Sequence, residues 1–450
     1  MENQTTLNER ERFPFVKEDI LELILLVLIS LAPFSLQINA FIFKNYEIVG
    51  LSAFNALVLL AFCFKVAVII TASFAKTGIG SRVQGFSILA AFGVFVLVVV
   101  CKMLLANDLS QALGWLSQYQ YFLWVPIVLF VFLNLRISSN YFVKLSLGIS
   151  WVVCAISLYS FFSSNYFGLV TQATLDNYAI VSIPFYRMMG TFGSPNVAGA
   201  YYAIILVMLL YLGNIQNRVL KVLHVIVLGS CLILSFSRMA LIGLVCCLFF
   251  YLLFRTDNSE QRNKHNSRGF LAAFGLLVAA IMVILILRES GFYFWEGFDI
   301  VNNPRIEKWT SFLMSFDQWI LIGAPLFEHI SMGSLTLSDN SFLLLLGAVG
   351  LFAAALYIFF IGKPLLNLAK SNPKLKTVYI MLIVFLVLSD FVSLYPCNYY
   401  AALLIWALGY NKENEYEATH NYTPMSLSSG KKWRNSYPVQ SLKEQSSTRD

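Results

Sequence analysis

Long apolar runs recur along the chain, and about twelve of them have the length of a membrane-spanning helix. A barrel strand would be about half as long and would alternate in polarity, so these runs favour helices. The pattern therefore predicts an all-α integral membrane protein, a polytopic bundle of about 12 transmembrane helices. The predicted spans are residues 20–42, 46–71, 83–106, 119–135, 141–162, 195–213, 219–235, 238–254, 269–287, 339–361, 376–393 and 396–410.

Composition supports the same fold class. Hydrophobic residues make up 58% of the chain and charged residues only 12%, whereas a soluble domain carries about 25% charged residues. So few polar side chains cannot cover the surface of a soluble fold of this size. The net charge of +7 therefore bears on orientation in a lipid bilayer, and no nucleic-acid partner is expected.

Lysine and arginine concentrate in alternate loops, and such positive loops stay in the cytoplasm. The richer set comprises Lys76, Arg82, Arg136, Arg218, Lys221, Arg255, Arg262, Lys264, Arg268, Lys363, Lys370, Lys374 and Lys376. The poorer set comprises Lys44, Arg187, Arg238, Arg288, Arg305 and Lys308. This distribution predicts a multi-pass membrane protein with both termini cytoplasmic. Residues 1–410 form one membrane domain, and the Ser-rich tail, 411–450, is predicted to be disordered.

Two large loops, 163–194 and 288–338, fall on the predicted periplasmic side. Loops longer than about 15 residues are usually functional or disordered, and the aromatic content of the second loop favours order. Its aromatic residues either sit at the membrane interface or stack on sugar rings. They are Phe292, Tyr293, Phe294, Trp295, Phe298, Trp309 and Trp319.

This face has few basic residues, and three of its arginines are candidate anion ligands: Arg187, Arg238 and Arg305. Arginine binds phosphate oxygens through a planar fork that lysine cannot copy. Arg187 also precedes Ser194-Pro195-Asn196, which predicts a helix start whose free N–H groups attract an anion. The alternative is that each arginine pairs with a carboxylate or anchors a loop.

Asp339 and Asn340 stand at the start of a strongly apolar span, where an acidic residue either caps the helix or acts as a base. His329 upstream is a second candidate base. The chain contains no phosphate-binding glycine loop, no metal-ligand spacing and no zinc-protease motif. We therefore expect no cofactor and no metal, and any transferase activity requires a substrate activated elsewhere.

Four segments resemble motifs of the bacterial O-antigen polymerase and O-antigen ligase superfamily of lipid-linked oligosaccharide transferases. Residues 187–196 resemble the family's Arg-then-Gly-then-Pro-Asn segment, and residues 235–238 its Ser-x-Ser-Arg hairpin. Residues 305–309 resemble its Arg-x-x-x-Trp segment, and residues 339–343, with Gly350-Leu351 downstream, its span-start motif. The resemblance covers roughly 180–360, and elsewhere only the hydropathy agrees.

The resemblance implies an enzyme of the cell inner membrane that joins undecaprenyl-pyrophosphate-linked oligosaccharide repeat units at the periplasmic face into O-antigen, capsule or exopolysaccharide. It implies that the three arginines bind pyrophosphate, and that Asp339 or His329 deprotonates the acceptor. Asn196, Asn340 and Trp309 would contact substrate. Chain-length regulator and flippase proteins are the implied partners, and the implied reaction uses neither nucleotide nor metal.

Two alternatives stay open. Ligases of the family usually carry His where this chain has Asp339, which favours a polymerase over a ligase that transfers glycan to lipid A-core. A lipid-linked sugar flippase or secondary transporter would place polar residues along a path within the spans. The mid-span regions are almost free of charge, and Lys65 and Lys102 are expected to snorkel to the interface.

Overall fold

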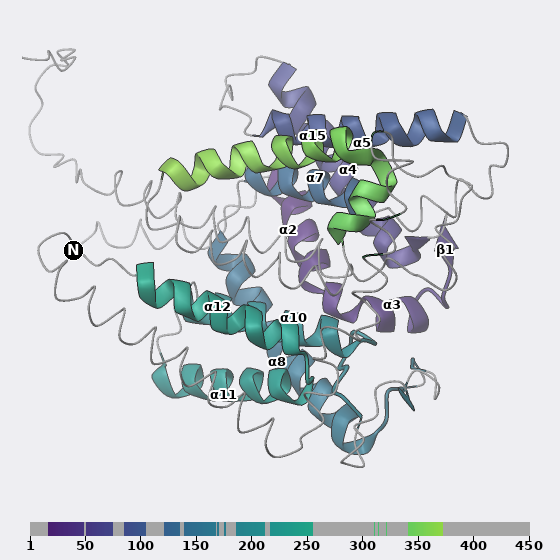
Figure 1. The fold of residues 1–450 in the computed structure, drawn as a ribbon. Helices are drawn as coiled ribbons and strands as arrows, with labels where there is room; N and C mark the ends of the chain where they lie inside the picture. The colour runs from purple at the N-terminus through teal and green to yellow at the C-terminus, as the bar shows by residue number, and fades with distance from the viewer. Residues whose placement is uncertain are drawn as a thin grey trace, which may run out of the picture. The chain divides into compact units, whose positions relative to one another are not determined.

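The described part of the chain is almost entirely helical (Figure 1). Apart from a two-residue antiparallel pair, β1 (Glu47–Ile48) and β2 (Leu51–Ser52), its regular elements are helices. This agrees with the predicted all-α class. The computed structural model describes residues 17–48, 51–74, 85–104, 121–135, 139–167, 169–170, 175–176, 186–211, 217–254, 341–371 and the single residues 310, 314 and 321.

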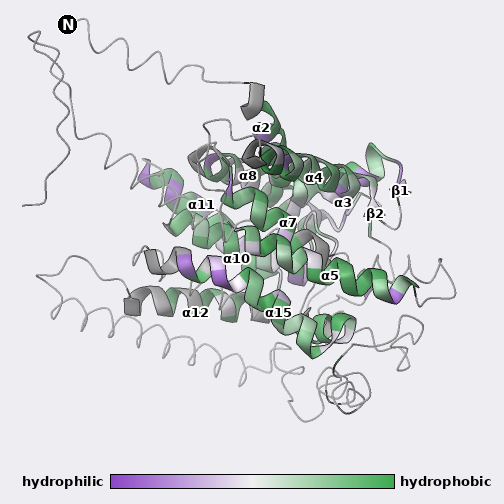
Figure 2. Ribbon diagram, turned by 90° about the horizontal axis from the view of Figure 1, so that it is seen from above, coloured by the Kyte–Doolittle hydropathy of each residue, from purple (hydrophilic) through white to green (hydrophobic). Residues whose placement is uncertain are grey.

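Within the described residues, several helices suit a lipid environment. Four are long and apolar enough to cross a membrane, and a bent pair of helices brings the number to five if it counts as one span. Large apolar side chains stand exposed on these helices, among them Leu60, Leu97 and Phe352, and Figure 2 shows hydrophobic residues along them. Such surfaces are costly in water and stable in lipid. The four helical stretches are Ala53–Thr71, Phe86–Leu104, Phe142–Ser163 and Leu345–Pro364.

Most of the predicted spans that fall in the described residues coincide with single helices. These helices are α4 (Ala53–Phe74), α5 (Phe86–Leu104), α7 (Tyr121–Leu133), α8 (Ser139–Ser163), α10 (Pro195–Tyr211), α11 (Arg218–Leu234), α12 (Arg238–Phe254) and α15 (Ser341–Ser371). The predicted spans 269–287, 376–393 and 396–410, the loop 288–338 and the tail 411–450 lie outside the described residues.

The first predicted span, 20–42, is not one continuous helix. It forms α2 (Lys17–Ser30), the 3-10 turn η1 (Ala32–Phe34) and α3 (Ser35–Phe41). The two α-helices are bent by 49°, because Pro33 has no N–H and its ring clashes with the preceding turn. The second predicted span, 46–71, begins only at Ala53, because the strand pair occupies its first residues.

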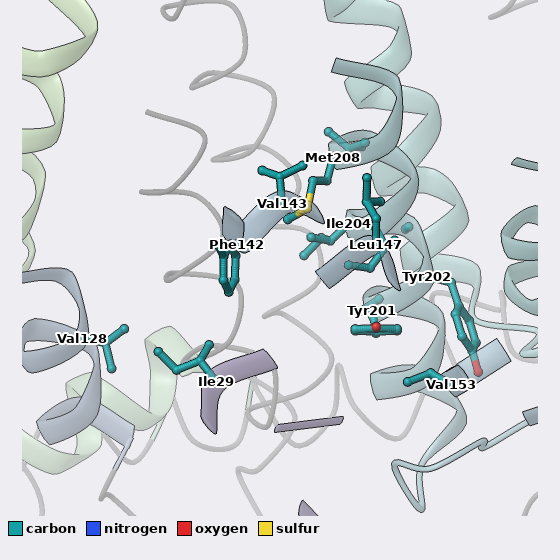
Figure 3. Packing of buried hydrophobic residues seen from close by; sticks show 14 of the residues in the cluster. Ile29, Val128, Phe142, Val143, Leu147, Val153, Tyr201, Tyr202, Ile204 and Met208 are labelled. Atoms are coloured by element: carbon teal, nitrogen blue, oxygen red, sulfur yellow. The ribbon is translucent and has the colours of Figure 1, made fainter. Parts of the chain in front are cut away.

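Two apolar clusters hold the described helices together. The larger one packs α8 against α10, where Figure 3 shows Leu147 and Val153 near the fully buried Tyr201 and Tyr202. The smaller one lies between α5, α7 and α15. In it the rings of Phe95, Phe122 and Tyr357 lie within 6.2 Å of one another, centroid to centroid. The larger cluster positions the candidate site.

Candidate functional site

Two of the four motifs, far apart in sequence, meet at one place. The connection between α11 and α12 is a hairpin, Ser235–Ser237, and Arg187 reaches it from the segment before α10. Arg187 Nε donates to the Ser235 carbonyl oxygen (3.1 Å), and Nη2 donates to the Phe236 carbonyl oxygen (3.0 Å). Nη2 also donates to Asn196 Oδ1 at 2.9 Å. The guanidinium fork thus ties the hairpin to the first turn of α10.

The hairpin needs this anchor because its central residue has an unfavourable backbone conformation. Phe236 has a φ of 49°, a left-handed region that costs a residue with a Cβ roughly 1–2 kcal/mol. Arg187 binds the carbonyl groups on either side of that φ angle. The described contacts of Arg187 therefore match the anchoring alternative.

Further bonds fix the segment that carries Arg187. Met188 N donates to the Leu234 carbonyl oxygen at the end of α11 (3.0 Å). Gln37 Nε2 of α3 donates to the Thr191 carbonyl oxygen (3.2 Å). The segment is therefore attached to elements from two distant parts of the sequence, and this explains how an irregular backbone is held beside apolar helices.

Two glycines permit this close packing. Gly190 has a φ of 56°, and an added Cβ would overlap Ser157 and approach the Tyr202 hydroxyl to 2.7 Å. That hydroxyl donates to Ser157 Oγ (2.6 Å). Gly199 of α10 lies against the hairpin, where an added Cβ would overlap Ser237 and come within 2.6 Å of the Ser235 hydroxyl. Gly190 thus lets the Arg187 segment pack on α8 and α10, and Gly199 lets α10 pack on the hairpin.

We expect Gly199→Ala to lower the free energy of unfolding by about 1–3 kcal/mol, the usual cost of overpacking. Gly229→Ala is the matched control, because Gly229 lies within α11 and its added Cβ would meet nothing within 4 Å. The control should be neutral or slightly stabilising, since alanine favours helix. Thermal unfolding of both purified variants in detergent measures the difference, and equal midpoints would show that the contact is not tight.

Positive electrostatic potential gathers at the hairpin. Both α10 and α12 begin here, with Pro195 as the first residue of α10 and Arg238, half-buried, as the first of α12. The predicted helix start at Pro195 is confirmed, and the Ser194 carbonyl accepts from Ala198 N (3.0 Å). Helix N-termini carry partial positive charge and bind anions. Two N-termini and two arginines thus lie around one hairpin.

The described parts of the first large loop carry a small apolar cluster of their own. Tyr166, Leu175 and Met189 are buried in it, and Tyr186 packs against them. Burial, together with the neighbouring Tyr186, raises the pKa of the Tyr166 hydroxyl. Tyr166 therefore stays neutral at physiological pH and serves as a packing residue against Met189.

Five predicted site residues lie outside the described residues: Arg305, Trp309, His329, Asp339 and Asn340. Their roles stay predictions. Of the predicted set, the structure brings Arg187 and Asn196 into direct contact and places Arg238 at the end of the same hairpin.

The expectation that Lys65 and Lys102 snorkel is wrong. Lys65 of α4 is 5% exposed and forms an ion pair with Glu22 of α2, which is fully buried. Lys102 of α5 is 7% exposed, and its ammonium donates to the Ala348 carbonyl oxygen of α15 at 2.5 Å. Each ammonium group therefore binds a buried partner and does not reach the membrane–water interface. An acidic and a basic residue in neighbouring apolar runs was the sequence signal for the first pair.

No family model matches the chain, and no curated protein matches it. Among the described residues, no group of three or more His, Cys, Asp or Glu side chains is placed to hold a metal ion. The helices define the class, a helical protein with several helices suited to a membrane. Its candidate site is the hairpin Ser235–Ser237 that Arg187 holds.

Proposed function

We propose that the protein is a polymerase of lipid-linked oligosaccharide repeat units, with about a dozen spans and its site on the periplasmic face of the inner membrane. One observation carries the proposal. Arg187 of one family-like motif binds the hairpin of another as well as Asn196 of its own motif, and Arg238 begins the helix that follows. This arrangement is suited to an anionic group such as a pyrophosphate.

In the proposed reaction, a hydroxyl of the acceptor sugar attacks the anomeric carbon of the donor glycan. The bond from that carbon to the pyrophosphate oxygen breaks, and undecaprenyl pyrophosphate leaves with the electron pair. Asp339, or His329, takes the hydroxyl proton. Arg238 and Arg305 stabilise the charge that develops on the leaving group, and Arg187 holds the hairpin that presents Arg238.

The proposal predicts that Arg238→Ala lowers polymer formation about 100-fold, the usual effect of losing one donor to developing charge. Arg238→Lys should recover only part of the activity, because an ammonium cannot form the bidentate contact. Each variant is expressed in a deletion strain, and surface polysaccharide is compared on gels after normalisation to membrane protein. Arg218→Ala, an exposed arginine at the other end of α11, is the control and should be unchanged.

The deletion strain itself separates the two enzymatic possibilities. If lipid A-core carries a single repeat unit and the ladder of longer polymers is lost from the gel, the protein is a polymerase. Bare core, with polymer accumulating on the carrier lipid, identifies a ligase. Wild-type amounts of polymer from properly expressed Arg238→Ala would refute the pyrophosphate assignment.

A second candidate function gains support from buried charge. Glu22, Lys65 and Lys102 lie inside the helical body, and the apolar runs are interrupted at Pro33 and Gly350. Interrupted helices and intramembrane charges are typical of transporters. Proteoliposomes that carry labelled lipid-linked oligosaccharide distinguish the two. Movement of the label between leaflets without formation of longer glycans would favour a flippase.

A further inference from the structure

Helix α15 is broken at Gly350. This residue has φ 79° and ψ 170°, a combination open almost only to glycine. Regular helical bonding from residue i to residue i+4 cannot continue through such a residue. Ala348, just before the break, is fully buried, so water cannot satisfy its carbonyl group. An unsatisfied carbonyl group in a lipid environment is strongly unfavourable, so the break requires a partner from elsewhere.

Lys102 supplies that partner. Its Nζ donates to the Ala348 carbonyl oxygen at 2.5 Å, and both residues are buried. The carbonyl end of a helical segment carries partial negative charge, which a lysine ammonium stabilises. Lys102 therefore acts as a C-terminal cap for the segment of α15 before Gly350, delivered from the neighbouring helix α5 (Figure 1).

A second bond fixes α15 beyond the break. The Tyr357 hydroxyl donates to the Phe122 carbonyl oxygen in the first turn of α7 (2.9 Å). In a regular helix that carbonyl would accept from residue 126, which is Pro126 and has no N–H. Tyr357 thus satisfies a carbonyl that the proline leaves open. One hydrogen bond on each side of Gly350 therefore ties α15 to a neighbouring helix. Before the break the partner is Lys102 of α5, and beyond it the partner is the Phe122 carbonyl of α7.

We propose that Lys102 is a positioning residue that keeps α15 broken at Gly350 and thereby sets the direction of its first segment, Ser341–Val349. Asp339 and Asn340 immediately precede this segment in the sequence. The consequence for catalysis rests on the proposed function, in which that pair meets the acceptor hydroxyl. The capping role itself does not depend on it.

The capping role is tested first, by a measurement that needs no substrate. Spin labels on p-acetylphenylalanine at positions 343 and 359 leave the native cysteines untouched and report the separation of the two segments of α15. Lys102→Met should shift or broaden the distance distribution between the labels, and Lys102→Arg should preserve it. Lys144→Met is the control, because Lys144 is exposed on α8 and belongs to neither labelled segment. An unchanged distance distribution in Lys102→Met overturns the proposal, independently of the protein's function.

The consequence for catalysis is tested with the full-length protein and lipid-linked repeat units. Lys102→Met and Gly350→Ala should each lower kcat about 10- to 100-fold with little change in KM, because substrate binds but the base is misaligned. Lys102→Arg should retain most of the kcat. A shifted distance distribution with unchanged kcat would overturn the positioning role. A wild-type protein that forms no polymer, with the Lys102→Met distribution still shifted, would refute the proposed function and leave the cap standing.

Discussion

Lys65→Met is expected to lower the free energy of unfolding by about 3–5 kcal/mol, the usual cost of removing one partner of a buried ion pair. The Glu22 carboxylate is fully buried and Lys65 is its ion-pair partner. Without the ammonium, an uncompensated charge stays in an apolar core. Glu22→Met should be similarly destabilising, because it leaves the ammonium alone.

The double variant Glu22→Met/Lys65→Met is expected to be close to wild type, because two packed apolar side chains replace the ion pair without a desolvation cost. Denaturant titration of the four purified proteins in detergent gives the coupling energy. Lys363→Met, on the far part of α15, is the matched control for losing a lysine. A double variant as unstable as either single variant would show that the two side chains do not act as a pair.

The same variants bear on function. If the ion pair is structural, the double variant forms polymer at the wild-type rate, as the proposed polymerase requires. If the pair lies on a transport path, the double variant folds but moves no substrate. A stable, inactive double variant would therefore favour the second candidate function.

Helices were the most predictable part of the fold, because the length of an apolar run is set by the thickness of the membrane. The predicted span 238–254 has the same bounds as α12, and Pro195 begins α10 as predicted. In both cases a local signal marks the start, an arginine after a serine-rich turn or a proline at the first helical position.

Breaks within the helices and the pairing of distant side chains were not predictable in this way. Pro33 lies inside a continuous apolar run, and hydropathy alone does not show whether a helix bends there. Gly350 was noted only as part of a motif, and because glycine is common in membrane helices, its presence did not predict a helix break. The partners of Lys65 and Lys102 lie in other helices. Glu22 in a neighbouring apolar run was a signal for the first pair, but which groups meet depends on how the helices pack.

The candidate site was predictable only as separate motifs. The sequence indicates that Arg187 and the hairpin after α11 matter, but their contact spans 48 residues of chain and depends on how α10 and α11 pack. The choice between anchor and ligand for Arg187 also needed the structure, because the same guanidinium N–H donors can bind either phosphate oxygens or backbone carbonyls.

Arg187→Ala is expected to lower the free energy of unfolding by about 2–4 kcal/mol, since it removes charge-assisted hydrogen bonds worth about 1.5–3 kcal/mol each, partly replaced by water. Two hairpin carbonyls and Asn196 lose a donor, and the left-handed Phe236 loses its support. Arg187→Lys should show a smaller loss, because one ammonium cannot reproduce the planar fork. Thermal unfolding in detergent, alongside polymer formation in the deletion strain, measures both effects.

The comparison with Arg238 separates an anchor from a ligand. If Arg187 anchors the hairpin that presents Arg238, Arg187→Ala lowers stability and polymer formation together. Arg238→Ala, at the half-buried first position of α12 after the same hairpin, lowers polymer formation and leaves the unfolding midpoint within a few degrees of wild type. An Arg187→Ala protein that unfolds like wild type yet forms no polymer would contradict the anchoring role and make Arg187 a direct phosphate ligand. Because both arginines lie at one hairpin, comparing the two variants separates the loss of a positive charge near the substrate from the loss of the hairpin's support.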